Sequence, residues 1–290
     1  MKIQSLSICV PGGCCNRCKF CVAHMVEENY TNQIEGNRRF LDLYKKDFKN
    51  RLLFARDNGC NTMILTGNGE PLLNRRFLEN IGEWNANIPQ PFRWIELQTS
   101  GALLDDEYLR FLRNTVGVTT ISLSLSSIFS DDENAEYNQP QNPKFRVDIE
   151  KLCEEIKRYD FTLRLSLNLT DFYNGKSADE IFARVKALGA DQVTMRVLYK
   201  SDTNSAEDQW IDEHKADDKI ITEIREYIKK NGRALEVLPF GATRYAVNEI
   251  STVLDDDCMG TAVTETLKYL ILRPDCKLYS HWNDKGSLVF

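Results

Sequence analysis

The sequence lacks a long uncharged hydrophobic run, and this absence argues against a membrane protein. None of its apolar stretches approaches the ~20 residues needed to cross a bilayer. The N-terminal residues Met1–Ser5 lead straight into a predicted strand without the organisation of a signal peptide. A basic excess is also missing, because the net charge is -6, so unspecific binding to a nucleic-acid backbone is not expected. We therefore expect a soluble, cytoplasmic protein whose partners include neither a membrane nor a nucleic acid.

Cysteine, in contrast, is plentiful, with nine residues in the chain. In a cytoplasmic protein these are better explained as metal ligands and buried thiols than as disulfides. Cys14, Cys18 and Cys21 have the spacing C-x3-C-x2-C and follow a predicted strand, in a loop opened by Pro11-Gly12-Gly13. Such a loop bends without strain and can wrap three thiolates around one inorganic centre. Three ligands are one too few for a closed structural site, which predicts an open position for another molecule.

Three kinds of inorganic centre could use cysteines of this triplet as ligands. A bacterial ferredoxin run would begin at Cys15, but Met25 stands where its fourth cysteine is required. A zinc site would need further ligands from His24 and from the distant Cys258 or Cys276. The third alternative is an iron–sulfur cubane with three cysteine ligands and one free iron, and we favour it.

Strand-like and helix-like patterns alternate along the chain as six βα units, whose right-handed crossovers predict a parallel sheet. We predict an α/β fold, with a partial (β/α)6 barrel over residues 1–235 and a short C-terminal extension over 236–290 that caps the barrel mouth. Two polar, acidic stretches, 127–145 and 199–218, are predicted as loops. The predicted strands are 5–10, 62–66, 93–98, 119–125, 161–169 and 192–198, and the predicted helices are 38–57, 75–84, 105–114, 146–158, 178–188 and 219–230.

The predicted strands also carry a polar face. Strand 161–169 alternates leucines with Arg164, Ser166 and Asn168, and with a period of two the polar set shares one side. A closed eight-stranded barrel would need a centre of Val, Ile and Leu, which these strands do not supply. We therefore expect an open barrel whose polar concave face holds a polar ligand. The alternative is an antiparallel sheet with a solvated polar face, and the intervening helices argue against it.

A glycine-rich turn, Gly67-Asn68-Gly69-Glu70-Pro71, directly follows the second predicted strand. Its glycines let the backbone approach a ligand closely, and Glu70 can accept hydrogen bonds from a cationic amine. It is not a phosphate loop, because the motif G-x-x-x-x-G-K-[ST] is absent from the sequence. Taken alone, the turn would be interpreted as an ordinary connection between a strand and a helix.

Together, the cysteine loop and this turn resemble two motifs of the radical S-adenosylmethionine (SAM) superfamily. The triplet is similar to the family's cluster loop, and Gly67–Pro71 is similar to the glycine–glutamate–proline motif that contacts the amino group of SAM. The ends of the next two strands, Gln98–Gly101 and Ile121–Leu125, also resemble the family, in which a serine commonly reaches the SAM ribose or carboxylate. The resemblance covers roughly residues 5–235.

This resemblance implies a single [4Fe-4S] cluster on Cys14, Cys18 and Cys21, whose fourth iron chelates SAM. Reductive cleavage of SAM would yield a 5'-deoxyadenosyl radical that abstracts hydrogen from a small-molecule or peptide substrate, and the protein would orient the reactants and exclude water. An electron donor such as flavodoxin or ferredoxin is implied as a partner. The residues expected at the cofactor are Phe20 near the adenine, Gly67, Asn68, Gly69, Glu70, Gln98, Ser124 and Asn168, with Arg164 or Arg196 binding the SAM carboxylate or a substrate anion.

Several alternatives stay open at this stage. Either arginine could instead form an internal ion pair with Glu96. Residues 67–74 also resemble a turn of the adenine methyl synthases of ribosomal RNA, which carry methyl groups on a C-terminal cysteine; Cys258 is the only candidate here, and the acidic chain shows no basic footprint. A non-enzymatic iron–sulfur redox sensor is the last alternative, although it leaves the polar strand faces and the Glu70 turn without a task.

Overall fold

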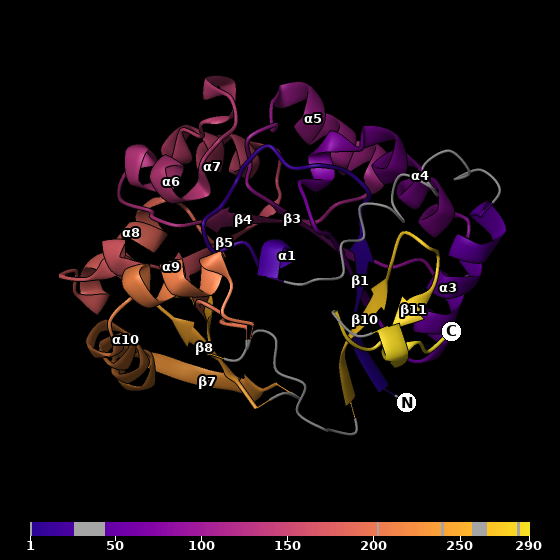
Figure 1. Cartoon of the computed structure of the whole chain (residues 1–290). Coiled ribbons are helices and arrows are strands. Elements are labelled where there is room, and N and C mark those ends of the chain that lie inside the picture. The colour runs from indigo at the N-terminus through magenta and orange to yellow at the C-terminus, as the bar shows by residue number, and fades with distance from the viewer. Residues whose placement is uncertain (1, 26–43, 202, 239–240, 257–265, 283–284) are drawn as a thin grey trace.

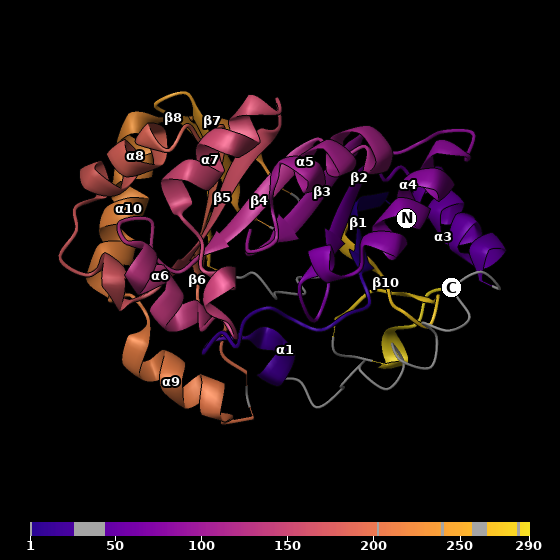
Figure 2. The same ribbon diagram turned by 90° about the horizontal axis from the view of Figure 1, so that it is seen from above.

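Eleven strands form one mixed sheet in the part of the chain that this computed structural model describes, which comprises residues 2–25, 44–201, 203–238, 241–256, 266–282 and 285–290. The strand order is β11-β10-β1-β2-β3-β4-β5-β6-β9-β8-β7, and the strands from β10 to β9 in this order are parallel. The sheet curves, and most helices cover its outer face (Figures 1 and 2). The predicted α/β fold with a parallel sheet is confirmed.

The six predicted strands and the helices after them are present, with ends that differ by a few residues from those predicted. The predicted start of the first helix, at residue 38, lies outside the described residues. The central strands are β1 (Lys2–Cys9), β2 (Thr62–Thr66), β3 (Trp94–Thr99), β4 (Thr120–Leu125), β5 (Thr162–Leu169) and β6 (Gln192–Val197). The connecting helices are α3 (Lys45–Asp57), α4 (Arg75–Ala86), α5 (Asp106–Phe111) with the π-helical turn Leu112–Val116, α7 (Ile149–Arg158), α8 (Ala178–Ala187) and α10 (Asp218–Asn231).

Pairing in register sets the polar residues of neighbouring strands side by side on the inner face of the sheet. Ser122 of β4 pairs with Arg164 of β5, which in turn pairs with Gln192 of β6. The residues between them, such as Leu163 and Leu165, are fully buried in the hydrophobic core. The sheet therefore has an apolar outer face and a polar concave face, as the alternation with a period of two predicts.

The two stretches predicted as loops each contain a helix, which corrects the prediction. Stretch 127–145 holds α6 (Asp131–Asn138) and the 3-10 turn Pro143–Phe145, and stretch 199–218 holds α9 (Ala206–His214). Serines cap both helices, because Ser130 accepts a hydrogen bond from the backbone of Glu133, and Ser205 forms a capping box with Asp208. Acidic residues near a helix N-terminus are favourable, so the acidic composition that indicated loops belongs to these first turns.

The C-terminal segment adds strands to both edges of the sheet. On one edge, β9 (Ile250–Asp255), β8 (Thr243–Val247) and β7 (Gly232–Val237) follow β6. On the other edge, β10 (Thr266–Leu272) pairs with β1 and carries the short β11 (Leu278–Tyr279), before the 3-10 turn Lys285–Ser287. The predicted boundary at residue 235 falls within β7, and the capping of the barrel mouth by 236–290 stays a prediction. None of the described helices is both long and apolar enough to cross a membrane.

Candidate functional site

The cysteine loop leaves the end of β1 and crosses the open end of the sheet toward α6 (the indigo trace in Figure 1). It then reaches α1 (Val22–Met25), which contacts α9. Backbone hydrogen bonds fix the loop to the end of α6 and the segment that follows it, joining Lys19 N to Tyr137 O (3.1 Å), Arg17 N to Gln139 O (2.9 Å) and Gln141 N to Cys15 O (2.9 Å). The loop therefore spans the mouth of the partial barrel instead of folding back on β1.

The exposure of the thiols distinguishes the two possible spacings. Cys14 is exposed, and Cys18 and Cys21 are half-buried, whereas Cys15 is only 1% exposed. Burial raises the pKa of all four thiols, that of Cys15 to about 12, so the exposure and not the pKa separates the two sets. The accessible set is thus Cys14, Cys18 and Cys21, which is the set predicted to ligate the cluster.

The donor set of the loop fits an iron–sulfur centre with one open position. Burial, followed by the charges of Cys21 and Cys14, raises the pKa of the Cys18 thiol. A bound cationic centre would act in the opposite direction and favour the thiolates. Three soft thiolates are the ligands that such clusters take from proteins.

The further ligands that a zinc site would need are engaged elsewhere or lie outside the described residues. The His24 ring faces Glu207, with Nδ1 3.4 Å from the carboxylate, and Cys276 is buried in the turn before β11. Cys258 is not among the described residues. Within the described ranges, no three His, Cys, Asp or Glu side chains gather closely enough to hold one metal ion, and this includes Cys14, Cys18 and Cys21 in their present positions. The zinc alternative therefore gains no support from the structure.

The glycine-rich turn is bonded directly to the start of the cysteine loop. The backbone N–H of Glu70 donates to the carbonyl of Gly13 (2.8 Å), and the Asn74 amide donates to the carbonyl of Pro11 (2.7 Å). A Cβ at Gly69 would collide with that same Gly13 carbonyl, so only glycine permits this approach. The two motifs that the sequence separates by some 50 residues form one rigid unit at the carboxyl ends of β1 and β2.

The Glu70 side chain is hydrogen-bonded within the chain itself. Its carboxylate is 4% exposed, and each of its oxygens accepts hydrogen bonds from the chain itself. The donors are Leu72 N (3.2 Å) and Thr99 Oγ1 (2.7 Å) for Oε1, and Ser100 N (2.9 Å) and Ser100 Oγ (2.7 Å) for Oε2. Because a carboxylate has about four lone-pair positions, these donors saturate it. Glu70 thus ties the turn after β2 to the end of β3, and contact of its side chain with SAM stays a prediction.

Replacing Glu70 with glutamine is expected to lower the free energy of unfolding by about 1–3 kcal/mol, because the new amide N–H group would face donors instead of accepting from them. Urea denaturation of the cofactor-free protein measures this effect. Glu79→Gln on the exposed surface of α4 is the matched control and should change the unfolding free energy by less than about 0.5 kcal/mol. Wild-type stability of Glu70→Gln combined with a weaker SAM affinity would contradict this structural role.

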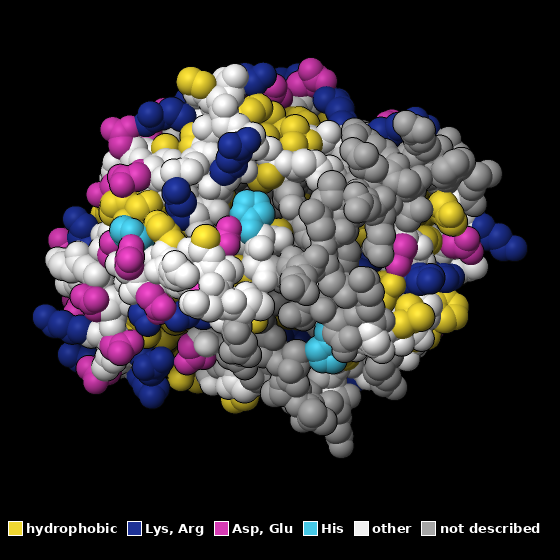
Figure 3. Space-filling model, viewed as in Figure 1, with side chains coloured by type: hydrophobic (Ala, Val, Ile, Leu, Met, Phe, Trp, Pro, Cys, Tyr) yellow, Lys and Arg dark blue, Asp and Glu magenta, His cyan; other side chains and the backbone are white. Residues whose placement is uncertain are grey.

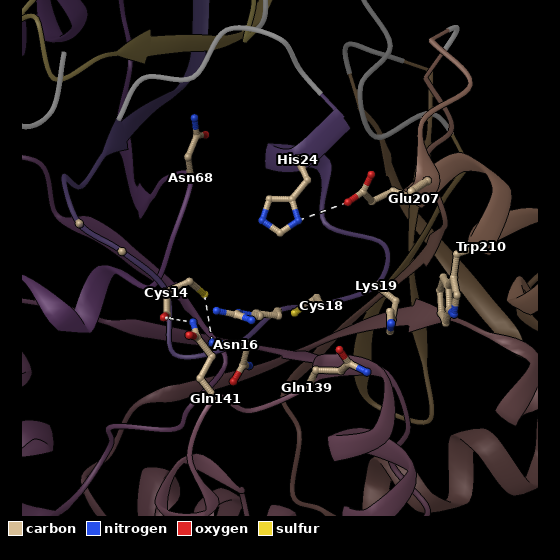
Figure 4. A pocket seen from close by; sticks show the side chains of 14 residues that line it. Cys14, Asn16, Cys18, Lys19, His24, Asn68, Gln139, Gln141, Glu207 and Trp210 are labelled. Atoms are coloured by element: carbon tan, nitrogen blue, oxygen red, sulfur yellow. Dashed lines mark hydrogen bonds and ion pairs between the residues drawn. The ribbon is translucent and has the colours of Figure 1, made fainter. Parts of the chain in front are cut away.

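A cavity of about 670 Å³ lies beside the cysteine loop (Figure 4). This volume is within the range of roughly 300–1,000 Å³ that is typical of small-molecule sites. Polar side chains from four separate segments surround it, so it can hold a polar ligand of nucleoside size. The labelled lining residues are Cys14, Asn16, Cys18, Lys19 and His24 of the cysteine loop and α1, Asn68 of the glycine-rich turn, Gln139 and Gln141 after α6, and Glu207 and Trp210 of α9.

Aromatic side chains connect this cavity to α9, a helix that the sequence did not reveal. The Phe20 ring lies 6.0 Å from the Trp210 ring, which stacks on His214 at 4.6 Å and meets Tyr137 edge-on at 4.7 Å. The hydroxyl of Tyr137 donates to Asp171 (2.8 Å). Phe20, predicted to pack near the adenine, is thus held against one wall of the cavity. In the sequence, the capping serine Ser205 was the signal that could have predicted α9, the helix that forms this wall.

The remaining predicted residues lie on the concave face of the sheet. Gln98 donates to Glu96 (3.1 Å), and Asn168 donates to Ser124 (3.2 Å). Arg164 forms the internal ion pair with Glu96 that was its alternative role, and it also donates from Nε to Gln192 (2.8 Å). Arg196 is different, because its Nε is buried and has no hydrogen-bond partner among the described residues. Gly67 lies in the glycine-rich turn after β2 and not on the concave face, and a Cβ at this position would be 2.9 Å from the carbonyl oxygen of Val10.

A curved parallel sheet with a three-cysteine loop across its carboxyl end defines a class of protein, and the comparisons name it. Residues 8–141 match the family model described as "Radical SAM superfamily". This match places a radical SAM domain over residues 8–141, a little under half of the chain, and it confirms the resemblance found in the sequence. A comparison with curated proteins finds no significant match.

Solved structures with a similar fold include a radical SAM enzyme and two proteins with bound S-adenosylmethionine. Coproporphyrinogen III oxidase (HemN) from Escherichia coli has 17% identity and a TM-score of 0.56, over 80% of this chain and 54% of its own. Streptococcus suis SuiB bound to S-adenosylmethionine has 14% identity and a TM-score of 0.58, over 96% and 60%. Native anSMEcpe with bound AdoMet has 14% identity and a TM-score of 0.61, over 98% and 77%. At these identities the likeness shows the fold, and the chain spans less than two thirds of the first two proteins.

Proposed function

We propose that the chain is a radical SAM enzyme that abstracts hydrogen from a small-molecule or peptide substrate. Cys14, Cys18 and Cys21 would hold the [4Fe-4S] cluster, and the cavity beside them would hold SAM. The observation that carries this proposal is the bonding of the glycine-rich turn to the cysteine loop through Glu70 and Gly13, next to that cavity. Reductive cleavage of SAM to methionine and a 5'-deoxyadenosyl radical is the chemistry that the cluster supplies when bound.

The chain's own residues have separate tasks in this proposal. The cysteine loop, bonded to the glycine-rich turn and to residues 137–141, would keep the thiols of Cys14, Cys18 and Cys21 at the mouth of the barrel to hold the cluster. Asn68, Gln139 and Gln141 offer amide groups to the polar parts of SAM. Phe20 and Trp210 form an apolar wall that shields one side from water. The polar concave face below the cavity then remains for the substrate.

Anaerobic incubation with SAM and dithionite, followed by mass spectrometry, tests the proposal. We expect 5'-deoxyadenosine in amounts that exceed the enzyme and that depend on both reagents. Iron and sulfide assays of the reconstituted protein should give about four of each per chain, because the described residues offer three ligands for one cluster. About eight of each, or the absence of 5'-deoxyadenosine from a fully loaded protein, would contradict the proposal.

The alternatives gain no support from the structure. Cys258, on which the RNA-directed methyl synthase depends, lies outside the described residues. On the face shown in Figure 3, the described lysine and arginine side chains are interspersed with aspartate and glutamate instead of gathering into a basic patch. In a redox sensor, the cavity beside the cysteine loop would have no function. Flavodoxin or ferredoxin stays our proposal for the electron donor.

A further inference from the structure

Two opposite charges lie side by side on the concave face. Arg196 of β6 and Asp255 of β9 are partners in the parallel register, each near the carboxyl end of its strand. Met195, which precedes Arg196, is fully buried in the core on the outer side. With a period of two, Arg196 therefore points to the inner face, and its register partner Asp255 points the same way.

Neither charge is neutralised within the described part of the chain. The Nε of Arg196 is buried without a hydrogen-bond partner, and Asp255, 8% exposed, makes no side-chain hydrogen bond or ion pair with any described residue. The neighbouring pair on this face behaves differently, since Arg164 is bonded to Glu96 and Gln192. Hence one pair of charges on the concave face is satisfied internally and the other is not.

Such an arrangement is unfavourable unless a ligand completes it. Asp255 is a buried charge without a partner, which loses its hydration and gains nothing in return, whereas Arg196 is half-buried and only its Nε is both buried and unpaired. The arginine fork matches a carboxylate, and an aspartate accepts hydrogen bonds from an ammonium group. Neighbouring strands lie about 4.8 Å apart, so the two side chains present their charges close enough to meet an ammonium and a carboxylate on the same carbon.

We propose that Arg196 and Asp255 bind the zwitterionic head of a free α-amino acid substrate, with its carboxylate on Arg196 and its ammonium on Asp255. This inference rests on the proposed function and names its substrate class. SAM carries the same zwitterion, which the proposed function assigns to the cluster held by Cys14, Cys18 and Cys21. We assign the substrate zwitterion to Arg196 and Asp255 as a separate subsite, and the variants below distinguish the two.

Calorimetry on the anaerobically reconstituted protein, with SAM present and no reductant, tests this subsite without turnover. The probes are the common L-α-amino acids, each added as the free amino acid. We expect at least one to bind, and its analogues without the carboxylate or without the amine to bind at least about tenfold more weakly. Arg196→Gln and Asp255→Asn should weaken amino-acid binding by about the same factor, with Arg196→Lys between them and the wild type.

The control is Asp256→Asn, which changes the adjacent exposed carboxylate that pairs with Arg225 on the outside of the sheet. It should leave amino-acid affinity within about twofold of wild type, and all variants should keep their SAM affinity within the same limit. If no amino acid binds the wild-type protein, the proposal is wrong. It is also wrong if the variants lose SAM affinity while amino-acid binding is unchanged, because SAM itself would then occupy the pair. The analogue series on wild-type protein decides the matter even where a variant fails to fold, and its result is independent of the 5'-deoxyadenosine assay.

Discussion

Replacing Cys18 with alanine is expected to abolish 5'-deoxyadenosine formation and to reduce the iron content of the reconstituted protein from about four atoms per chain to less than about one. Cys18 is the middle ligand of the triplet, and its thiol feels the charges of both Cys14 and Cys21. Loss of an outer-shell partner of a metal ligand already costs about 10–100-fold, so loss of a ligand itself should exceed about 100-fold in SAM cleavage. An iron assay and the visible absorbance of the cluster measure the loss of iron, and mass spectrometry measures the loss of 5'-deoxyadenosine.

Cys15→Ala is the matched control from the same loop. Its side chain is buried, so its removal should cost about 1 kcal/mol of folding stability and leave iron content and SAM cleavage within about twofold of wild type. A cysteine-to-alanine change at position 14 should instead behave like Cys18→Ala. If Cys15→Ala loses the iron while Cys14→Ala retains it, the C-x2-C-x2-C spacing is the correct one and the assignment of Cys14 is wrong.

Gly69→Ala is expected to separate the two halves of the site. The new Cβ would collide with the carbonyl oxygen of Gly13 and lie 2.8 Å from its carbonyl carbon, and backbone atoms cannot rotate out of the way. The hydrogen bond from Glu70 N to Gly13 O would break as the glycine-rich turn and the cysteine loop move apart. We expect the free energy of unfolding to fall by about 2–3 kcal/mol, measured by urea denaturation, and SAM cleavage to fall more than about tenfold.

Gly13→Ala tests whether this effect depends on contact or only on the loss of a glycine. No atom lies within 4 Å of a Cβ at Gly13, so this variant should unfold within about 0.5 kcal/mol of wild type. Equal stability of the two alanine variants would show that the approach of the turn to the loop is looser than the structure describes.

The sequence predicted the six βα units because each is encoded by local patterns. Strand β2 was placed at its observed limits from apolar residues bounded by Gly59 and Gly67. Helices α6 and α9 were missed because their polar, acidic composition outweighed the capping serines Ser130 and Ser205. Residues 236–290 were predicted as an appendage, since nothing local indicates that β9 pairs with β6 or β10 with β1.

The same limit applies within the site. The cysteine spacing is local, so the triplet was recognised directly, and the burial of Cys15 agrees with the choice made. The roles of Arg164 and Arg196 could not be separated, because the ion pair with Glu96 depends on the register across three strands. Asp255 was not considered for the same reason, since β9 follows β6 in the sheet but not in the chain. The saturation of Glu70 by Thr99 and Ser100 likewise arises only once β3 lies beside β2.

The anchoring of the cysteine loop to residues 137–141 also has a consequence for biosynthesis. The thiols leave the ribosome near the start of translation, yet the backbone groups that shape their loop follow only after α6 has been made. A nascent chain that ends before residue 141 would therefore present three unorganised, oxidisable thiols. We expect cofactor insertion to be a late event in the maturation of this protein, after much of the sheet has assembled.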